Sequence, residues 1–174
     1  YELYCKLVDE QIRRIKGEYV PEESDEISVE LPLPANIPNW YIENESLKLA
    51  IYKKISGVNS ENKEDEMVDE LLDRFGDVPK ETMNLIRISR VQALCQEVSV
   101  LRIYAQNNRI FFSFGEKNCL TPFAIVNIND KFKGRAFIHG GKEPYIRIPQ
   151  VKGLILKDCL ELLNIIKENM KDAI

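Results

Sequence analysis

The feature that most constrains the fold of this chain is a change in the spacing of its apolar residues near residue 99. Through residues 79–98 the apolar side chains recur at intervals of three and four, which is the pattern of one helical face. Residues 100–105 and 109–114 have the apolar pattern of strands. Asn107 and Asn108 lie between those segments, and asparagine tolerates positive φ, so a tight hairpin is expected there. The chain is therefore expected to change from helices to strands at this point.

The order of elements after residue 99 predicts a ββα-ββα arrangement. Thr121–Pro122 is a suitable cap and first turn for a helix that continues to about residue 131. Residues 135–139 and 145–148 are expected to form a second hairpin, and residues 153–171 a strongly amphipathic last helix. We therefore predict an α+β fold, in which an N-terminal helical segment is followed by an antiparallel sheet covered by helices.

The first 98 residues are predicted to be mainly helical. Residues 27–31 alternate and are expected to form a short strand, and the prolines that follow predict that it lies at the edge of a sheet. Residues 1–98 and 99–174 are expected to make one domain. Because helical spacing begins at Tyr1 with no cap before it, we expect this domain to be part of a longer protein. The expected helices cover residues 1–16, 45–56, 60–75 and 79–98.

Composition narrows the class of protein. The chain has 174 residues, 44% of them hydrophobic and 30% charged, which excludes disorder of the whole chain. Its net charge of −4 argues against a generally basic surface for nucleic acids. No stretch approaches the roughly 18 apolar residues of a membrane helix, so no membrane partner is expected. The four cysteines lie among apolar neighbours without a C-x-x-C pair, which predicts reduced thiols in a cytoplasmic protein.

The motifs of common catalytic sites are missing from this sequence. The nearest text to a phosphate-binding loop runs from Gly134 to Glu143, but its glycine spacing is wrong and Glu143 stands where a hydroxyl is needed. His139 is the only histidine, so a histidine-based metal site or catalytic triad has no partners. We therefore expect no catalytic, metal-binding or cofactor-binding residues in this chain, and no cofactor.

The most informative segment is residues 61–73, which hold seven acidic residues and one lysine. On a helix, four of the acids fall within about 100° of each other, and the apolar residues occupy the opposite side. Such a stripe is either an ordinary solvated face or a docking face for a basic partner, which would relieve the repulsion among the acids. The four acids are Glu66, Asp69, Glu70 and Asp73, and the apolar residues are Met67, Val68, Leu71, Leu72 and Phe75.

The same segment continues into the run ELLDRFGDVP, residues 70–79. This run resembles the motif E-L-[LI]-D-R-F-G-x-x-P of the C-terminal domain of the bacterial transcription-repair coupling factor. Two other stretches are similar to that family in the same order, YELYC at residues 1–5 and LKLAIYKKI at residues 47–55. The resemblance is strong over residues 1–103 and weak beyond them. One departure is Glu43, where the family usually has proline, which affects the expected shape of that loop.

The resemblance implies a role for the chain. A full-length family member is an ATP-driven translocase on double-stranded DNA that pushes on RNA polymerase stalled at a lesion and recruits nucleotide excision repair. Its C-terminal domain docks on an N-terminal module of the same polypeptide, hides the surface for the excision-repair damage-recognition subunit and restrains the motor. We therefore expect a non-catalytic, autoinhibitory clamp domain, with RNA polymerase and DNA as partners only through the full-length protein.

Within the acidic segment, Glu70 and Asp73 are expected to make the charged contacts to the N-terminal module, because they belong to the motif itself. Glu66 and Asp69 are expected to help more weakly. Arg74 either contacts the partner or pairs with Glu70 one helical turn earlier.

Four further motif residues are expected to be structural. Leu72 and Phe75 are predicted to face inward, Gly76 to end the helix and Pro79 to open the next one.

A second hypothesis is a direct nucleic-acid-binding module in the β-rich half. Basic residues among aromatic residues on a sheet can bind phosphates and stack bases. Against it, three phenylalanines within five residues are more often half core, and the net charge opposes binding. The residues concerned are Arg87, Arg90, Arg102, Arg109, Phe111, Phe112 and Phe114.

Overall fold

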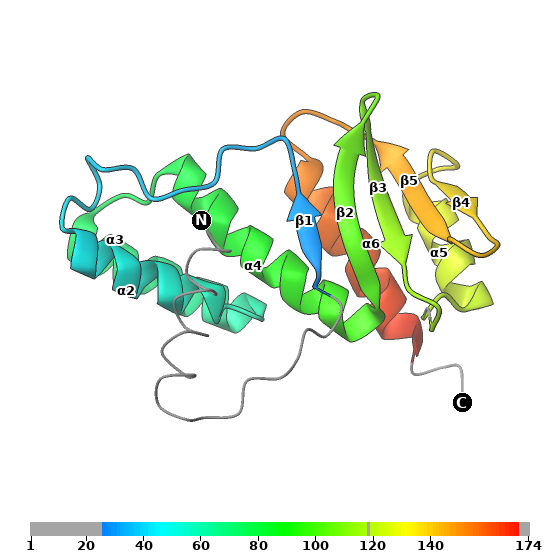
Figure 1. Cartoon of the computed structure of the whole chain (residues 1–174), viewed down its shortest axis with the longest axis horizontal. Coiled ribbons are helices and arrows are strands. Elements are labelled where there is room, and N and C mark those ends of the chain that lie inside the picture. Colours follow the sequence, from blue (N-terminus) through cyan, green and yellow to red (C-terminus); the bar gives the residue numbers. More distant parts are fainter. Residues whose placement is uncertain (1–25, 118, 171–174) are drawn as a thin grey trace. The chain divides into compact units, whose positions relative to one another are not determined.

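The computed structural model describes residues 26–117 and 119–170, which fall into two compact units (Figure 1). Unit 1 includes residues 33–89, and unit 2 includes residues 27–32 together with everything from residue 90 onward. The helix expected over residues 1–16, with the YELYC stretch, lies outside the described residues.

Unit 1 is helical, as the apolar spacing predicted. Its helices are α2 (Glu45–Ser56), α3 (Glu61–Phe75) and the first part of α4 (Lys80–Val98). Each of the first two helices begins at a side chain that accepts a backbone N–H and so stabilises the first turn. Asn44 accepts from the amide of Leu47, and Ser60 accepts from the amide of Lys63.

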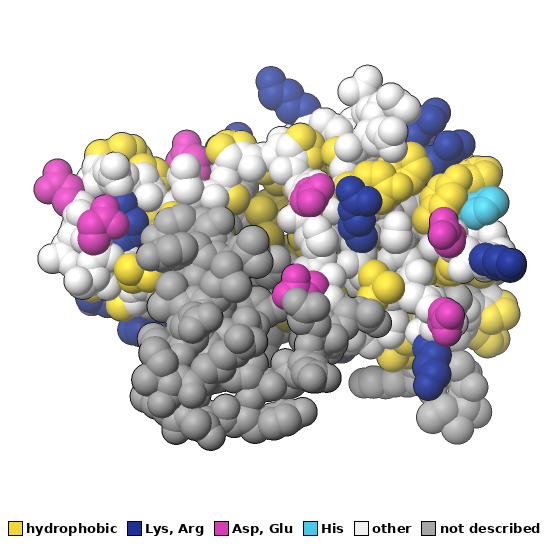
Figure 2. Space-filling view, viewed as in Figure 1, with side chains coloured by type: hydrophobic (Ala, Val, Ile, Leu, Met, Phe, Trp, Pro, Cys, Tyr) yellow, Lys and Arg dark blue, Asp and Glu magenta, His cyan; other side chains and the backbone are white. Residues whose placement is uncertain are grey.

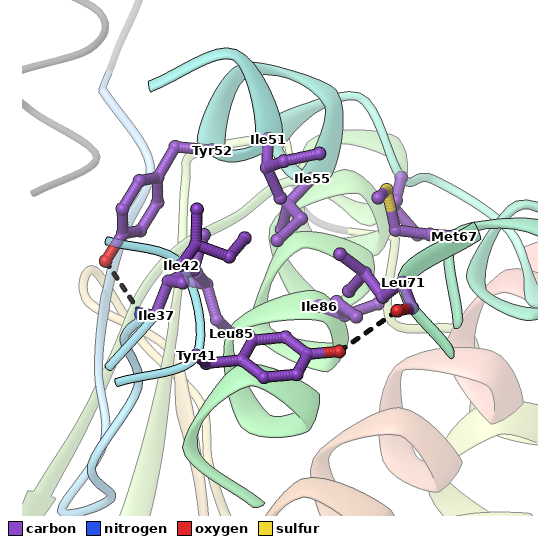
Figure 3. Packing of buried hydrophobic residues seen from close by; sticks show 11 residues of the cluster. Ile37, Tyr41, Ile42, Ile51, Tyr52, Ile55, Met67, Leu71, Leu85 and Ile86 are labelled. Carbon is purple, nitrogen blue, oxygen red and sulfur yellow. Dashed lines mark hydrogen bonds between the residues drawn. The ribbon is translucent and has the colours of Figure 1, made fainter. Parts of the chain in front are cut away.

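One apolar cluster holds unit 1 together (Figure 3). Ile51 and Ile55 of α2, Leu71 of α3 and Ile86 of α4 are each at most 1% exposed. Residues 33–44, which contain no helix or strand, supply Ile37, Tyr41 and Ile42 to the same cluster.

Polar contacts fix this irregular segment against the helices. The amide of Ile37 donates to the hydroxyl of Tyr52 at 2.8 Å. Asn84 of α4 donates to the carbonyl of Pro34 at 2.9 Å, and the Thr82 hydroxyl donates to the carbonyl of Asn36 at 3.0 Å. The segment is therefore part of the core of unit 1, although it has no regular secondary structure.

Unit 2 contains a five-stranded sheet in the order β1-β2-β3-β5-β4. The hairpin between β2 and β3 turns at Asn107 and Asn108, both at positive φ as predicted, and the order β2-β3-α5-β4-β5-α6 reproduces the expected ββα-ββα pattern. The α+β class is thus confirmed, but the sheet is mixed, because β1 runs parallel to β2 while the other pairs are antiparallel. The strands are β1 (Ser28–Glu30), β2 (Val100–Gln106), β3 (Arg109–Phe114), β4 (Phe137–His139) and β5 (Tyr145–Pro149).

Helices cover one face of this sheet. Helices α5 (Pro122–Lys131) and α6 (Ile155–Met170) pack against each other and lie behind the strands in Figure 1. Burial raises the pKa of the Cys95 thiol, on the part of α4 that belongs to unit 2, to about 12. Burial also raises the pKa of Cys159 on α6, and nearby Cys95 adds to this. Both thiols are fully buried, whereas Cys119 is only partly buried and Cys5 lies outside the described residues.

Candidate interaction surface

Helix α3 turns most of its acids to solvent, and Glu66, Asp69 and Asp73 are exposed. None of the three has an ion pair or hydrogen bond within the described part of the chain, whereas Glu70, the fourth acid of the predicted stripe, is only partly exposed. Glu64, one turn from the helix start, is different. It is buried among the inward residues, and its carboxylate accepts from the guanidinium Nε of Arg87 at 3.2 Å.

Glu70 lies at the border of the stripe and already has cationic partners in unit 1. Its carboxylate is 2.9 Å from the Nζ of Lys54 on α2 and 3.4 Å from Nη1 of Arg74. The hydrogen bond from Lys54, together with the charges of Lys54 and Arg74, holds the pKa of Glu70 below its usual value. Of the two roles considered for Arg74, the structure shows the pairing with Glu70.

The C-terminal end of α3 is fixed by Gly76 and Tyr41. Gly76 has a φ of +87°, which glycine adopts without strain, and its amide donates to the carbonyl of Leu72. The Tyr41 hydroxyl is 2.9 Å from the carbonyl oxygen of Gly76 and 3.2 Å from that of Leu71 (Figure 3 draws the second contact). Burial, and secondarily the carboxylate of Asp77, raises the pKa of Tyr41.

The structure corrects the predicted role of Leu72. Its side chain is 49% exposed, whereas the neighbouring Leu71 is completely buried. The inward side of α3 is centred on Met67 and Leu71, and Leu72 lies about 100° further round the helix. Phe75 is half-buried and packs at the edge of the cluster, with its ring centroid 5.8 Å from that of Tyr41.

Gly76 and Pro79 have the structural roles that the sequence predicted. The helix ends at Gly76, and the next helix opens directly after Pro79, whose carbonyl accepts the amides of Thr82 and Met83. Pro79 is buried.

The residues of the nucleic-acid hypothesis do not all come together as one site. Phe112 and Phe114 are in the core of unit 2, and Arg87 pairs with Glu64 in unit 1. Arg102 and Phe111 do share one face of the sheet. Each lies next to residues of its own strand that point inward, so both side chains point outward.

Sequence reasoning missed Lys54 and Tyr41 as neighbours of the acidic helix. Lys54 contacts Glu70, which lies 16 residues later in the sequence, and Tyr41 contacts Leu71, which lies 30 residues later. Lys54 does lie in the family-like stretch at residues 47–55, but that stretch does not indicate which acid forms an ion pair with Lys54.

Two further findings bear on the class of site. Within residues 26–117 and 119–170, no group of three or more His, Cys, Asp or Glu side chains is arranged to hold a metal ion. No helix among those residues is both long and apolar enough to span a membrane.

Comparisons with known proteins agree with the motif resemblance. Residues 31–125, more than half of the chain, match the model of the TRCF domain family. The transcription-repair-coupling factors of Rickettsia typhi and Haemophilus influenzae are 34% and 30% identical over 164 and 135 residues. These alignments cover 94% and 75% of this chain but only 14% and 12% of the relatives, so the chain spans about one seventh of their length or less.

The fold is shared with a solved structure described as the C-terminal domain of transcription-repair coupling factor. The similarity has a TM-score of 0.73 at 23% sequence identity and covers 86% of this chain and 97% of that one. The family match includes α2, α3 and α4, which carry the motif and the acidic stripe. This chain belongs to the TRCF domain family, the family of the transcription-repair coupling factors.

Proposed function

We propose that this chain is the non-catalytic C-terminal regulatory domain of a longer transcription-repair coupling factor that acts in the cytoplasm. In this proposal it docks through α3 on the N-terminal module of the same polypeptide. Docking masks the surface for the excision-repair damage-recognition subunit and restrains the DNA translocase motor. RNA polymerase and DNA are reached only through the full-length protein.

The observation that carries the proposal is the row of exposed acids on α3 that form no ion pair among the described residues. Glu66, Asp69 and Asp73 are exposed, while Glu64 and Glu70 are paired inside unit 1. Like charges one turn apart repel one another on a helix. A basic partner surface would remove this repulsion and gain charge-assisted contacts.

The ion pairs of Glu70 distinguish it from the other acids of this surface. Its carboxylate already has Lys54 and Arg74, so contact with a partner cation gains less there than at an unpaired acid. We therefore assign the main contacts to Asp73, with Asp69 and Glu66 beside it, and a smaller part to Glu70.

The binding test uses isothermal titration calorimetry between this chain and the N-terminal module of the same coupling factor. Asp69→Asn with Asp73→Asn should weaken binding at least about tenfold, because losing one partner of a desolvated charge pair costs about 2–5 kcal/mol. Glu70→Gln should weaken it less. Glu43→Gln with Glu61→Gln is the matched control, since both are exposed acids away from the stripe. The two double variants should melt like the wild type, because exposed charges contribute little to stability.

The clamp itself is tested in the full-length protein. Glu70→Ala with Asp73→Ala should raise ATP turnover in the absence of polymerase and expose the site for the damage-recognition subunit. Wild-type turnover and wild-type binding of that subunit in the double variant would refute the clamp and leave the acids as an ordinary solvated face.

A further inference from the structure

The sheet of unit 2 has a second face that none of the described helices covers. Along β2, β3 and β5, the residues that point to the helices are apolar and buried, among them Ile103, Phe112 and Ile146. The residues between them point outward and are partly or fully exposed. We call the outward side chains of β2 to β5 the outer sheet face. Over the strands in Figure 2, apolar side chains lie together, with Lys and Arg and a few Asp and Glu side chains among them.

The strand register sets these outward side chains in rows across the sheet. In one row, Tyr104 on β2 pairs with Phe111 on β3, Phe111 with Arg147 on β5, and Arg147 with Phe137 on β4. In the next row, Arg102 is followed by Ser113, Tyr145 and His139. Aromatic and arginine side chains therefore occupy neighbouring positions on four adjacent strands.

The rings of the outer sheet face touch one another in a continuous series. Tyr104 and Phe111 are stacked, with centroids 5.0 Å apart and planes 5° apart. Phe111 reaches Tyr145 at 5.7 Å, and Tyr145 reaches Phe137 at 6.2 Å. Two guanidinium groups lie over these rings, Arg102 over Tyr104 and Arg147 over Phe137, each at 4.3 Å from the centroid. Phe137 is 44% exposed.

The charge of this face is opposite to that of the chain. Three arginines, at positions 102, 109 and 147, point outward, whereas Glu30 on β1 is the one acid at an outward position of the described strands. Glu30 and Arg102 are 3.7 Å apart and both more than half exposed. Beside Tyr104 the surface has an open hollow of about 610 Å³, bordered by Arg102, Gln106, Pro32 and the acid Glu30.

We propose that the outer sheet face binds single-stranded nucleic acid. Unpaired bases pack against the solvent-facing parts of the Tyr104 and Phe111 rings, which also contact each other and Arg102. Arg109 and Arg147 contact phosphates. The hollow beside Tyr104 receives the edge of one base, where Arg102 and Gln106 donate hydrogen bonds. The site is distinct from the acidic stripe of α3, which repels phosphates.

The test is fluorescence anisotropy of the 174-residue chain with labelled dT12 and U12 and with a 12-base-pair DNA duplex. Both single strands should bind at least about tenfold more tightly than the duplex, whose bases are already stacked. Tyr104→Leu and Phe111→Leu should each weaken binding about 5- to 100-fold, while Tyr104→Phe and Phe111→Tyr, which keep the ring, should bind like the wild type. A difference between dT12 and U12 decides whether DNA or RNA is preferred.

The charged residues give a second, independent measurement. Arg147→Gln should reduce the slope of log Kd against log salt by about 0.7, the value for one contact to a single-strand phosphate. Lys157→Gln removes the same charge from the exposed side of α6 and should leave the slope unchanged. Glu30→Gln should strengthen binding, because it removes the acid and frees Arg102.

Three results would overturn the proposal. They are no anisotropy change at 50 mM salt, equal binding of duplex and single strand, and wild-type affinity of folded Tyr104→Leu and Phe111→Leu chains, with folding checked by circular dichroism. In any of these cases the ring series is a packing feature of the sheet or a contact for another protein.

Discussion

Removing the Tyr41 hydroxyl should destabilise unit 1 in a way that depends on pH. In Tyr41→Phe the carbonyls of Gly76 and Leu71 lose the donor that lies 2.9 and 3.2 Å away, in a place where Tyr41 is only 8% exposed. A net hydrogen bond contributes about 0.5–1.5 kcal/mol, and a carbonyl left without a partner adds to the loss, so we expect a cost of about 1–2 kcal/mol. The urea midpoint should fall by about 0.5–1 M.

The fluorescence of Trp40, the only tryptophan, reports on this change because its ring lies 5.9 Å from that of Tyr41. Tyr104→Phe is the control, since the Tyr104 hydroxyl has no hydrogen bond among the described residues; its midpoint should not move.

The pH dependence follows from the raised pKa of Tyr41, which has burial as its main cause and Asp77 as its second. A group whose pKa is higher in the folded state contributes stability that is complete below its unfolded pKa, near 10, and is lost as the pH rises through the folded value. The advantage of the wild type over Tyr41→Phe should therefore shrink above pH 10. Equal midpoints at pH 7, or a constant difference from pH 8 to 11, would refute this account.

Two other predictions concern burial. In urea unfolding, Leu71→Ala should lower the free energy of unfolding by about 2–5 kcal/mol, because Leu71 is completely buried. Leu72→Ala should lower it by less than about 1 kcal/mol, and Phe75→Ala by an intermediate amount, since its ring is half-buried. Equal costs for the two leucines would contradict the burial described for α3. Cys95 and Cys159 should not react with a thiol reagent at pH 8 in the native chain, because burial keeps both thiols protonated, whereas partly buried Cys119 should react; peptide mapping by mass spectrometry distinguishes them, and rapid labelling of Cys95 would contradict its burial.

The helices and hairpins of this chain follow from local rules, which is why sequence reasoning located them. Ser60 and Gly76 bound α3 because a side-chain cap and a residue at positive φ act within one helical turn. Asn107 and Asn108 identify the hairpin because the turn itself needs positive φ at both positions.

Contacts between distant segments were beyond that reasoning. The alternation of residues 27–31 predicts a strand, and the prolines after it predict that it lies at an edge. The local sequence does not indicate that β1 pairs in parallel with β2, about 70 residues later. Leu72 was misjudged for a related reason. The wheel shows a broad apolar arc, and only the packing of α2 and α4 against Met67 and Leu71 decides which part of it is covered.

Net charge describes neither of the two surfaces proposed for this chain. The total of −4 is a sum over both units, and it conceals the difference between an acidic helix in unit 1 and an arginine-bearing sheet face in unit 2. In each case the residue period that builds the core also separates the charges. A helix that buries Met67 and Leu71 must present Asp69 and Asp73 together on its far side. A strand that buries Ile103 must turn Arg102 and Tyr104 to the other face. The surfaces should consequently respond to different partners, a cationic protein surface for α3 and a polyanion for the sheet, and a substitution on one should leave binding at the other unchanged.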